Sequence, residues 1–144
     1  MSFGVLGKLI IAELFLLFVQ FGFGMWNNLF VNVPLDAPFK FFVYSGGLEV
    51  LAHIINGVLI LAFAIAIIWF SFRTRNSLAL KLSVLAVIFI ISAIANGVIF
   101  LEIFSIPALY NSDNYFSLAM AISFLSAFTA LFSELYAIKI SEKP

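Results

Sequence analysis

The sequence predicts an all-helical integral membrane protein, folded as an up-down bundle of four transmembrane helices. The chain of 144 residues is 65% hydrophobic and only 10% charged, whereas a soluble domain carries about 25% charged residues. Its mean hydropathy is +1.21, and the apolar residues gather in four stretches that are each long enough to cross a bilayer as a helix. A water-soluble fold of this size could not bury so much apolar surface, so lipid is the expected solvent.

The four stretches are separated by residues that end helices. The predicted spans cover about residues 9–30, 42–72, 78–104 and 116–140. The first break contains Pro34 and the third contains Pro107, and proline cannot donate the hydrogen bond that continues a helix. The second break is the short polar turn 73–77, where Ser77 is predicted to cap the third helix. No loop is long enough for a further domain, so residues 1–144 are predicted to form one transmembrane domain.

Lysine and arginine positions predict the orientation of the bundle, because loops rich in these residues stay in the cytoplasm. Six of the seven flank the start of the first span, the second break or the end of the last span: Lys8, Arg73, Arg75, Lys81, Lys139 and Lys143. The seventh, Lys40, lies in the first break. Both termini are therefore predicted to be cytoplasmic, in a multi-pass protein of the cell membrane. Short breaks also make consecutive helices antiparallel neighbours.

Composition and missing motifs exclude several functions. The net charge is zero, so the sequence offers no electrostatic basis for binding nucleic acid. There are no cysteines, which excludes disulfides, thiolate metal sites, iron–sulfur clusters and covalent c-type haem attachment. The chain has no phosphate-binding glycine loop, nucleophile elbow or metalloprotease helix. We therefore predict no catalytic residues and no metal site, and expect no catalysis by the chain alone.

His53 is the only histidine, and it is predicted near the bilayer midplane. Counting about 1.5 Å per residue from the outer end of each span places Gln20 at about 15 Å, His53 at about 16 Å and Asn96 at about 14 Å, with Asn56 slightly deeper. An ionisable ring at that depth marks a candidate functional site. Glu49, one turn before His53, could bond one ring nitrogen and leave the other for a haem iron, a metal or a quinone carbonyl. The alternative is a structural histidine that Glu49 and an asparagine satisfy.

Glu13 and Glu134 form a second candidate site, because they are predicted at matching depth near the inner face of neighbouring helices. Two carboxylates close together in a low dielectric would share a proton, so this pair is a candidate proton or ion site. The alternative is that each side chain reaches the inner headgroups, near Lys8 and Lys139.

Residues 53–58 resemble residues 93–98, and both segments contain an Asn-Gly pair. Glycine would let the second and third helices approach closely. Asn56 and Asn96 could then hydrogen bond across the contact. The simplest interpretation of the repeat is helix packing.

Part of the chain resembles one four-helix half of the haem A synthase-type membrane haem proteins. The residues that carry the resemblance are Glu49-x3-His53, Arg73-x-Arg75 and Asn96-Gly97. The resemblance covers residues 45–100 and implies that His53 faces a haem. Those bundles carry a second histidine on a partner helix, which this chain lacks. A haem b would therefore need Met25, Met120, a second copy of the chain or another subunit to supply the second axial ligand.

Three functions remain open from the sequence. The first is a small, mainly structural integral subunit of a larger membrane complex, such as a respiratory one. The second is an electron-transfer module that binds haem b or quinone at His53. The third is a small oligomeric proton-coupled transporter or channel that uses Glu13, Glu134 and the midplane residues. In each case the expected partners are lipid and other membrane subunits or further copies of the chain.

Overall fold

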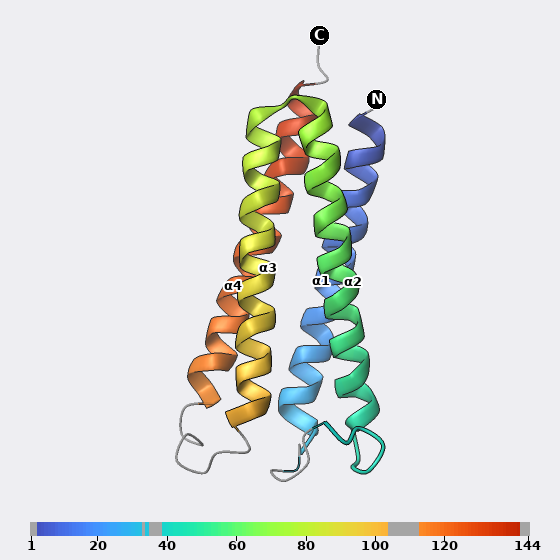
Figure 1. Cartoon of the computed structure of the whole chain (residues 1–144), viewed down its shortest axis with the longest axis vertical. Helices are drawn as coiled ribbons and strands as arrows, with labels where there is room; N and C mark the ends of the chain where they lie inside the picture. Colours follow the sequence, from blue (N-terminus) through green and yellow to red (C-terminus); the bar gives the residue numbers. More distant parts are fainter. Residues whose placement is uncertain (1–2, 33, 35–38, 104–112, 142–144) are drawn as a thin grey trace.

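The computed structural model describes residues 3–32, 34, 39–103 and 113–141. It contains four long helices (Figure 1): α1 (Phe3–Phe30), α2 (Gly47–Thr74), α3 (Ser77–Ile103) and α4 (Asp113–Ser141). No strand occurs in these described ranges. All four helices are long and apolar enough to cross a membrane, which confirms the predicted all-α architecture. The third break was predicted from Pro107, and the third span was predicted to end at Phe104. Both residues lie outside the described residues.

Each helix runs antiparallel to the two helices that it packs against (Figure 1). The contacts are α1 with α2, α2 with α3, α3 with α4, and α4 with α1. The most extensive contact is between α3 and α4. The start of α1, the end of α4 and the α2–α3 turn lie together at one end of the bundle, called here the termini end. The opposite end, called the loop end, holds the last residues of α1 and α3.

Buried side chains concentrate in the half of the bundle nearer the termini end. The fully buried apolar residues of this core include Leu6, Ile10, Ile67, Ala79 and Leu131. No residue of α1 after Leu17 is buried, and none in α3 between Ile90 and Phe100. Figure 1 shows the α1–α2 pair and the α3–α4 pair separating toward the loop end. Large apolar side chains such as Phe18 and Phe132, 68% and 60% exposed, cover the outside, as helices in contact with lipid require.

Helix α2 begins at Gly47, five residues later than predicted from hydrophobicity. Gly46 takes the left-handed conformation with φ 85°, which glycine adopts at little cost. The backbone of Phe41 lies directly against the Cα of Gly47. The chain therefore turns sharply before α2. Residues 42–46, which were predicted to begin the second span, belong to this turn.

The cap of α3 is also one residue away from its predicted position. Asn76, not Ser77, holds the helix start, because its Oδ1 accepts hydrogen bonds from the backbone N–H groups of Leu78 and Ala79, both at 3.1 Å. Ser77 is the first residue of the helix. Asparagine caps helices as well as serine does, so the sequence offered two adjacent candidates.

Candidate functional site

A buried polar cluster joins three helices near the termini end. Glu134 on α4 accepts hydrogen bonds at Oε1 from the hydroxyl of Ser71 on α2 at 2.5 Å and from that of Ser83 on α3 at 2.7 Å. The relative exposure of these side chains is 0% for Ser71 and Glu134 and 1% for Ser83. We call these three residues the Glu134 cluster. Interhelical hydrogen bonds of this kind tie apolar helices together in a bilayer.

The Glu134 cluster has more acceptors than hydrogens to satisfy them. The Ser83 hydroxyl lies within hydrogen-bond distance of Ser71 Oγ at 2.8 Å, of the Ala79 carbonyl at 2.9 Å and of Glu134 Oε1. A hydroxyl carries a single hydrogen, so it can donate to only one of the three at a time. Glu134 Oε2 has no hydrogen-bond partner among the described residues. The cluster can therefore hold its proton in more than one arrangement.

Glu13 on α1 is buried without any hydrogen bond. Its relative exposure is 0%, and neither carboxyl oxygen has a partner among the described residues. Ile10 and Leu17, which are also buried, occupy the same face of α1 one turn before and one turn after it. The headgroup interpretation requires the Glu13 and Glu134 side chains to reach the surface of the bundle. Both side chains are fully buried instead.

The two glutamates lie within about two turns of each other along the bundle. A Cβ atom added at Gly7 on α1 would lie 3.7 Å from Leu135 Cδ1 on α4, so Glu134 lies near the level of Gly7 and Glu13 lies about six residues, roughly 9 Å, farther from the termini end. Because side chains lean toward the N-terminus of their own helix, the two side chains lean toward each other. Neither carboxyl group hydrogen bonds to the other among the described residues.

Near the middle of the bundle, α1 and α2 are joined by a second polar network. The Asn56 amide nitrogen donates to Gln20 Oε1 at 2.8 Å as well as to the Leu16 carbonyl. With its oxygen accepting, Gln20 presents its NH₂ group to His53 Nε2 at 3.2 Å. The Leu16 carbonyl can only accept, which fixes the Asn56 and Gln20 NH₂ groups as donors. His53 Nε2 is therefore an acceptor, and the ring proton lies on Nδ1. The network therefore holds a neutral histidine.

The free nitrogen of His53 is not bonded to Glu49, contrary to the expectation from their spacing. His53 Nδ1 is buried and has no partner among the described residues. Glu49 instead lines a shallow groove between α1 and α2, together with Val19, Gly22, Phe23 and Trp26. Spacing by one turn puts two side chains on the same face, but here His53 leans toward Gln20 and Glu49 is left half-buried.

Asn96 does not join the other midplane residues. Its amide donates to the Ser92 carbonyl of its own helix at 2.7 Å, and Ser92 is linked to Ser123 of α4 at 3.1 Å. The repeated asparagines therefore do not bond to each other: Asn56 faces α1, whereas Asn96 lies on the α3–α4 side. The glycines of the repeat do not pack α2 against α3 either: a Cβ atom added at Gly97 would lie 3.3 Å from the Met120 sulfur of α4, and one at Gly57 would lie 3.4 Å from Gln20 Nε2 of α1.

The surroundings of His53 do not fit a haem or a quinone. Nε2 is engaged by Gln20, and Nδ1 is buried. A Cβ atom added at Gly24 would lie 3.4 Å from His53 Cε1, so α1 covers the ring. Of the two methionines considered as second ligands, Met120 packs against Gly97 and Met25 is 48% exposed on the outside of α1. No group of three or more His, Cys, Asp or Glu residues that could hold a metal occurs in the described ranges.

The buried polar atoms that lack partners follow one another along the bundle. Within the described residues they are Glu134 Oε2, both carboxyl oxygens of Glu13, His53 Nδ1 and Asn27 Oδ1. They occupy successive levels from the termini end to the loop end. We call the four residues that carry them the polar column. Buried polar groups are nearly always satisfied in native proteins, and the exceptions often mark a functional site or a bound ion or water.

Sequence reasoning missed Ser71, Ser83 and Asn27. A serine in an apolar helix usually bonds to its own backbone, so neither serine stood out. The available signal was their position: both lie within two turns of the α2–α3 turn, which brings them to the level of Glu134 when the helices pair. Asn27 lies in the last turn of α1, close to the predicted end of the first span, yet its Oδ1 is buried.

Fold and site together define a four-helix protein of membrane-spanning hydrophobicity with carboxyl groups buried in its core. Comparison with protein-family models, with curated proteins and with solved structures finds no match. The resemblance of residues 45–100 to haem A synthase-type proteins stays a prediction. The function is therefore argued from the site alone.

The α1–α2 network makes a prediction that separates the two asparagines. Asn56→Ala should lower the free energy of unfolding by about 1–3 kcal/mol, because it leaves the buried Gln20 oxygen without its donor. Asn96→Ala should cost no more than about 0.5 kcal/mol, since within the described residues Asn96 bonds only to Ser92 of its own helix. Unfolding by sodium dodecyl sulfate in mixed micelles measures both. Equal losses in the two variants would contradict the different roles assigned to the two asparagines.

Proposed function

We propose that this chain is a small proton-coupled transporter or channel of the cell membrane, working as a homo-oligomer or beside other membrane subunits. Glu134 and Glu13 are its proton-binding groups, and the termini end faces the cytoplasm. The observation that supports this proposal most strongly is the polar column, in which two buried carboxyl groups have three oxygens without partners. The excess of Lys and Arg at the termini end supports the orientation.

Burial of the two carboxyl groups is costly unless they bind something. An ionised carboxylate in the protein interior costs several kcal/mol when no counter-charge is near, so it takes up a proton or a cation. Among the described residues no cation contacts Glu13 or Glu134, and the only donors to either are Ser71 and Ser83. A purely structural role would be served better by apolar side chains of similar size, or by carboxyls with all their hydrogen bonds made. Exchange of protons accounts for both features.

The column is also long enough for transport. Along α2, the groups that contact or flank it extend from Ser71 to Glu49, which is roughly 33 Å at 1.5 Å per residue. The hydrocarbon core of a bilayer is about 30 Å thick. His53 and Gln20 lie between these two ends and carry the column past the midplane. Ordered water or side-chain rotation would complete the steps between neighbouring groups.

The absence of buried residues in the described stretches 18–30 of α1 and 91–100 of α3 favours partners there. A second copy of the chain, or another membrane subunit, would complete the walls around the outer part of the column. The proposal is therefore compatible with a subunit of a larger membrane complex. Proton transfer would then be the contribution of this chain to the complex. Native purification in mild detergent, followed by mass measurement of the assembly, distinguishes the homo-oligomer from the larger complex.

Proton flux in liposomes tests the proposal directly. Vesicles that contain the protein should acidify in response to an imposed pH gradient faster than empty vesicles, as reported by an enclosed pH dye. Glu134→Gln and Glu13→Gln keep the size of the side chain but cannot exchange a proton, so each should lower the flux at least about tenfold. Asn96→Ala, which lies off the column, is the control and should leave the flux unchanged. Flux no greater than in empty vesicles, or equal flux in both glutamine variants and the parent, would overturn the proposal.

A further inference from the structure

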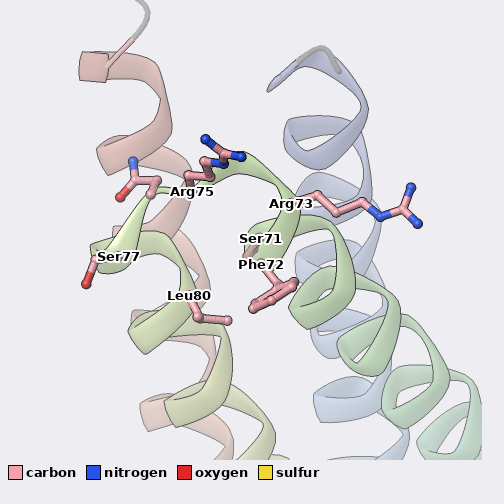
Figure 2. Close-up of a pocket in the computed structure, with 7 residues that line it drawn as sticks. Ser71, Phe72, Arg73, Arg75, Ser77 and Leu80 are labelled. Carbon is pink, nitrogen blue, oxygen red and sulfur yellow. The ribbon is translucent and has the colours of Figure 1, made fainter.

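One cavity of the described bundle reaches the Glu134 cluster. It lies at the α2–α3 turn, has a volume of about 510 Å³, and is lined by Ser71, Phe72, Arg73, Arg75, Asn76, Ser77 and Leu80 (Figure 2). Ser71 is one of the residues that line this cavity, and its fully buried hydroxyl donates a hydrogen bond to Glu134 at 2.5 Å. No other residue that lines the cavity has a hydrogen bond to Glu134 among the described residues.

We infer that Ser71 is the proton relay through which Glu134 exchanges protons with water at the termini end. This inference rests on the proposed function, since it names the access route to the proton-binding carboxyl. The cavity is open to the surface beside the α2–α3 turn, and Ser71 links it to the core. Ser71 is a positioning and relay residue, whereas Glu134 is the group that stores the proton.

The relay step conserves atoms and charge. The relay requires water to enter from the cavity as far as the buried Ser71 Oγ. There a hydronium ion gives a proton to Ser71 Oγ while the original hydroxyl proton of Ser71 moves to Glu134 Oε1. The bond from oxygen to hydrogen breaks in hydronium and in the serine hydroxyl, and new bonds form at Ser71 Oγ and at Glu134 Oε1. The products are water, a neutral serine and a neutral carboxylic acid. Rotation of the Ser71 hydroxyl back toward Glu134 resets the relay.

Ser83 supports the relay because its hydroxyl can donate to more than one acceptor in the cluster. Its hydroxyl can donate to Glu134 Oε1 at 2.7 Å or to Ser71 Oγ at 2.8 Å. Donation to Glu134 stabilises the carboxylate before proton transfer. Once Oε1 is protonated, the Ser83 hydroxyl can turn to Ser71 Oγ or to the Ala79 carbonyl at 2.9 Å. The same hydroxyl therefore serves both states of Glu134 without leaving a buried donor unpaired.

Two arginines line the cavity. The Arg73 guanidinium lies over the Trp69 ring, with its Cζ 4.6 Å from the ring centroid. Figure 2 shows the Arg73 and Arg75 side chains extending in different directions, away from Leu80. Their positive charge disfavours metal cations and hydronium alike in the cavity, so the arginines do not select between them.

Exchange of hydrogen for deuterium at the Glu134 carboxyl tests the relay. The full-length protein in lipid is followed by infrared spectroscopy after a jump into D₂O, using the carbonyl band that disappears in Glu134→Gln. Ser71→Ala should slow the shift of this band at least about tenfold, because it removes the transferring hydroxyl. Ser71→Thr restores a hydroxyl and should exchange at the parent rate. Ser77→Ala removes a hydroxyl from the same cavity without touching Glu134 and should also match the parent.

The outcomes separate the relay from the proposed function. Exchange in Ser71→Ala as fast as in the parent would overturn the relay, while the liposome flux would still support the proposed function. Absence of any Glu134-dependent carbonyl band across the accessible pH range would overturn the proposed function and the relay with it. Leu80→Trp fills the cavity and leaves the Ser71 hydroxyl in place, so slower exchange in this variant would support the cavity as the route. Parent-rate exchange there would contradict that route.

Discussion

Leu131→Ala is expected to lower the free energy of unfolding by about 2–5 kcal/mol, the range for deleting a fully buried leucine side chain. Leu131 is 0% exposed and belongs to the core cluster. It lies one turn before Glu134 on the same face of α4, so its loss would open a void beside the Glu134 cluster. Interiors are packed as densely as organic crystals, and the surrounding helices can fill such a void only in part.

The expected effect on function follows from the same void. A cavity next to the carboxyl would admit water, and the three hydrogen-bonding groups of the cluster would lose their fixed geometry. Proton flux should then depend less on Ser71 in the Leu131→Ala background than in the parent. Leu125→Ala on the same helix is the control, because Leu125 is 63% exposed and should change stability by no more than about 0.5 kcal/mol. Similar losses for both leucines would contradict the assigned core.

The sequence predicted four long helices because hydrophobicity alone indicates them. Spans in lipid must satisfy every backbone group internally, so a stretch of apolar residues has few alternatives to a helix. Helix ends were harder to place. The predicted second span began at the apolar pair Phe42-Val43, but the backbone conformation of Gly46 and the contact between Phe41 and Gly47 delay the start of α2 to Gly47. Such tertiary contacts leave no mark in a hydrophobicity pattern.

The candidate site was predictable in part. His53, Gln20 and Asn56 were expected at one level, and they are joined by hydrogen bonds in the structure. Depth alone could not show that Asn96 faces α4, because helical rotation decides which neighbour a side chain meets. The depth of Glu13 counted from the span end is only approximate, since α1 begins at Phe3, six residues before the predicted span.

The hydrogen-bond partners of the side chains were the hardest feature to predict from the sequence. The spacing of Glu49 and His53 suggested a bond that Gln20 makes instead. Serines in apolar helices have a satisfied alternative in their own backbone, so the participation of Ser71 and Ser83 depends on where α4 places Glu134. The hydrogen bonds of the polar column therefore depend on how the helices pack. The contact between Phe41 and Gly47 before α2 contributes to that packing.

Gly47→Ala is expected to be the most disruptive small substitution among the glycines of this chain. A Cβ atom at Gly47 would meet the backbone carbonyl of Phe41, and backbone atoms cannot move aside as a flexible side chain can. The cost should reach about 3 kcal/mol, the upper part of the range for overpacking. The start of α2 would have to shift, and Glu49 and His53 would shift with it along α1.

Gly22→Ala is the matched control for this substitution. A Cβ atom there would have nothing within 4 Å, and alanine favours a helix interior by about 0.5–1 kcal/mol over glycine. The control should therefore be neutral or slightly more stable in mixed-micelle unfolding, with unchanged proton flux. Gly47→Ala should lose both stability and flux, because the His53 level of the polar column depends on the register of α2 against α1. Parent-like stability in Gly47→Ala would show that the turn before α2 can rearrange freely, and the register of the column would then need another cause.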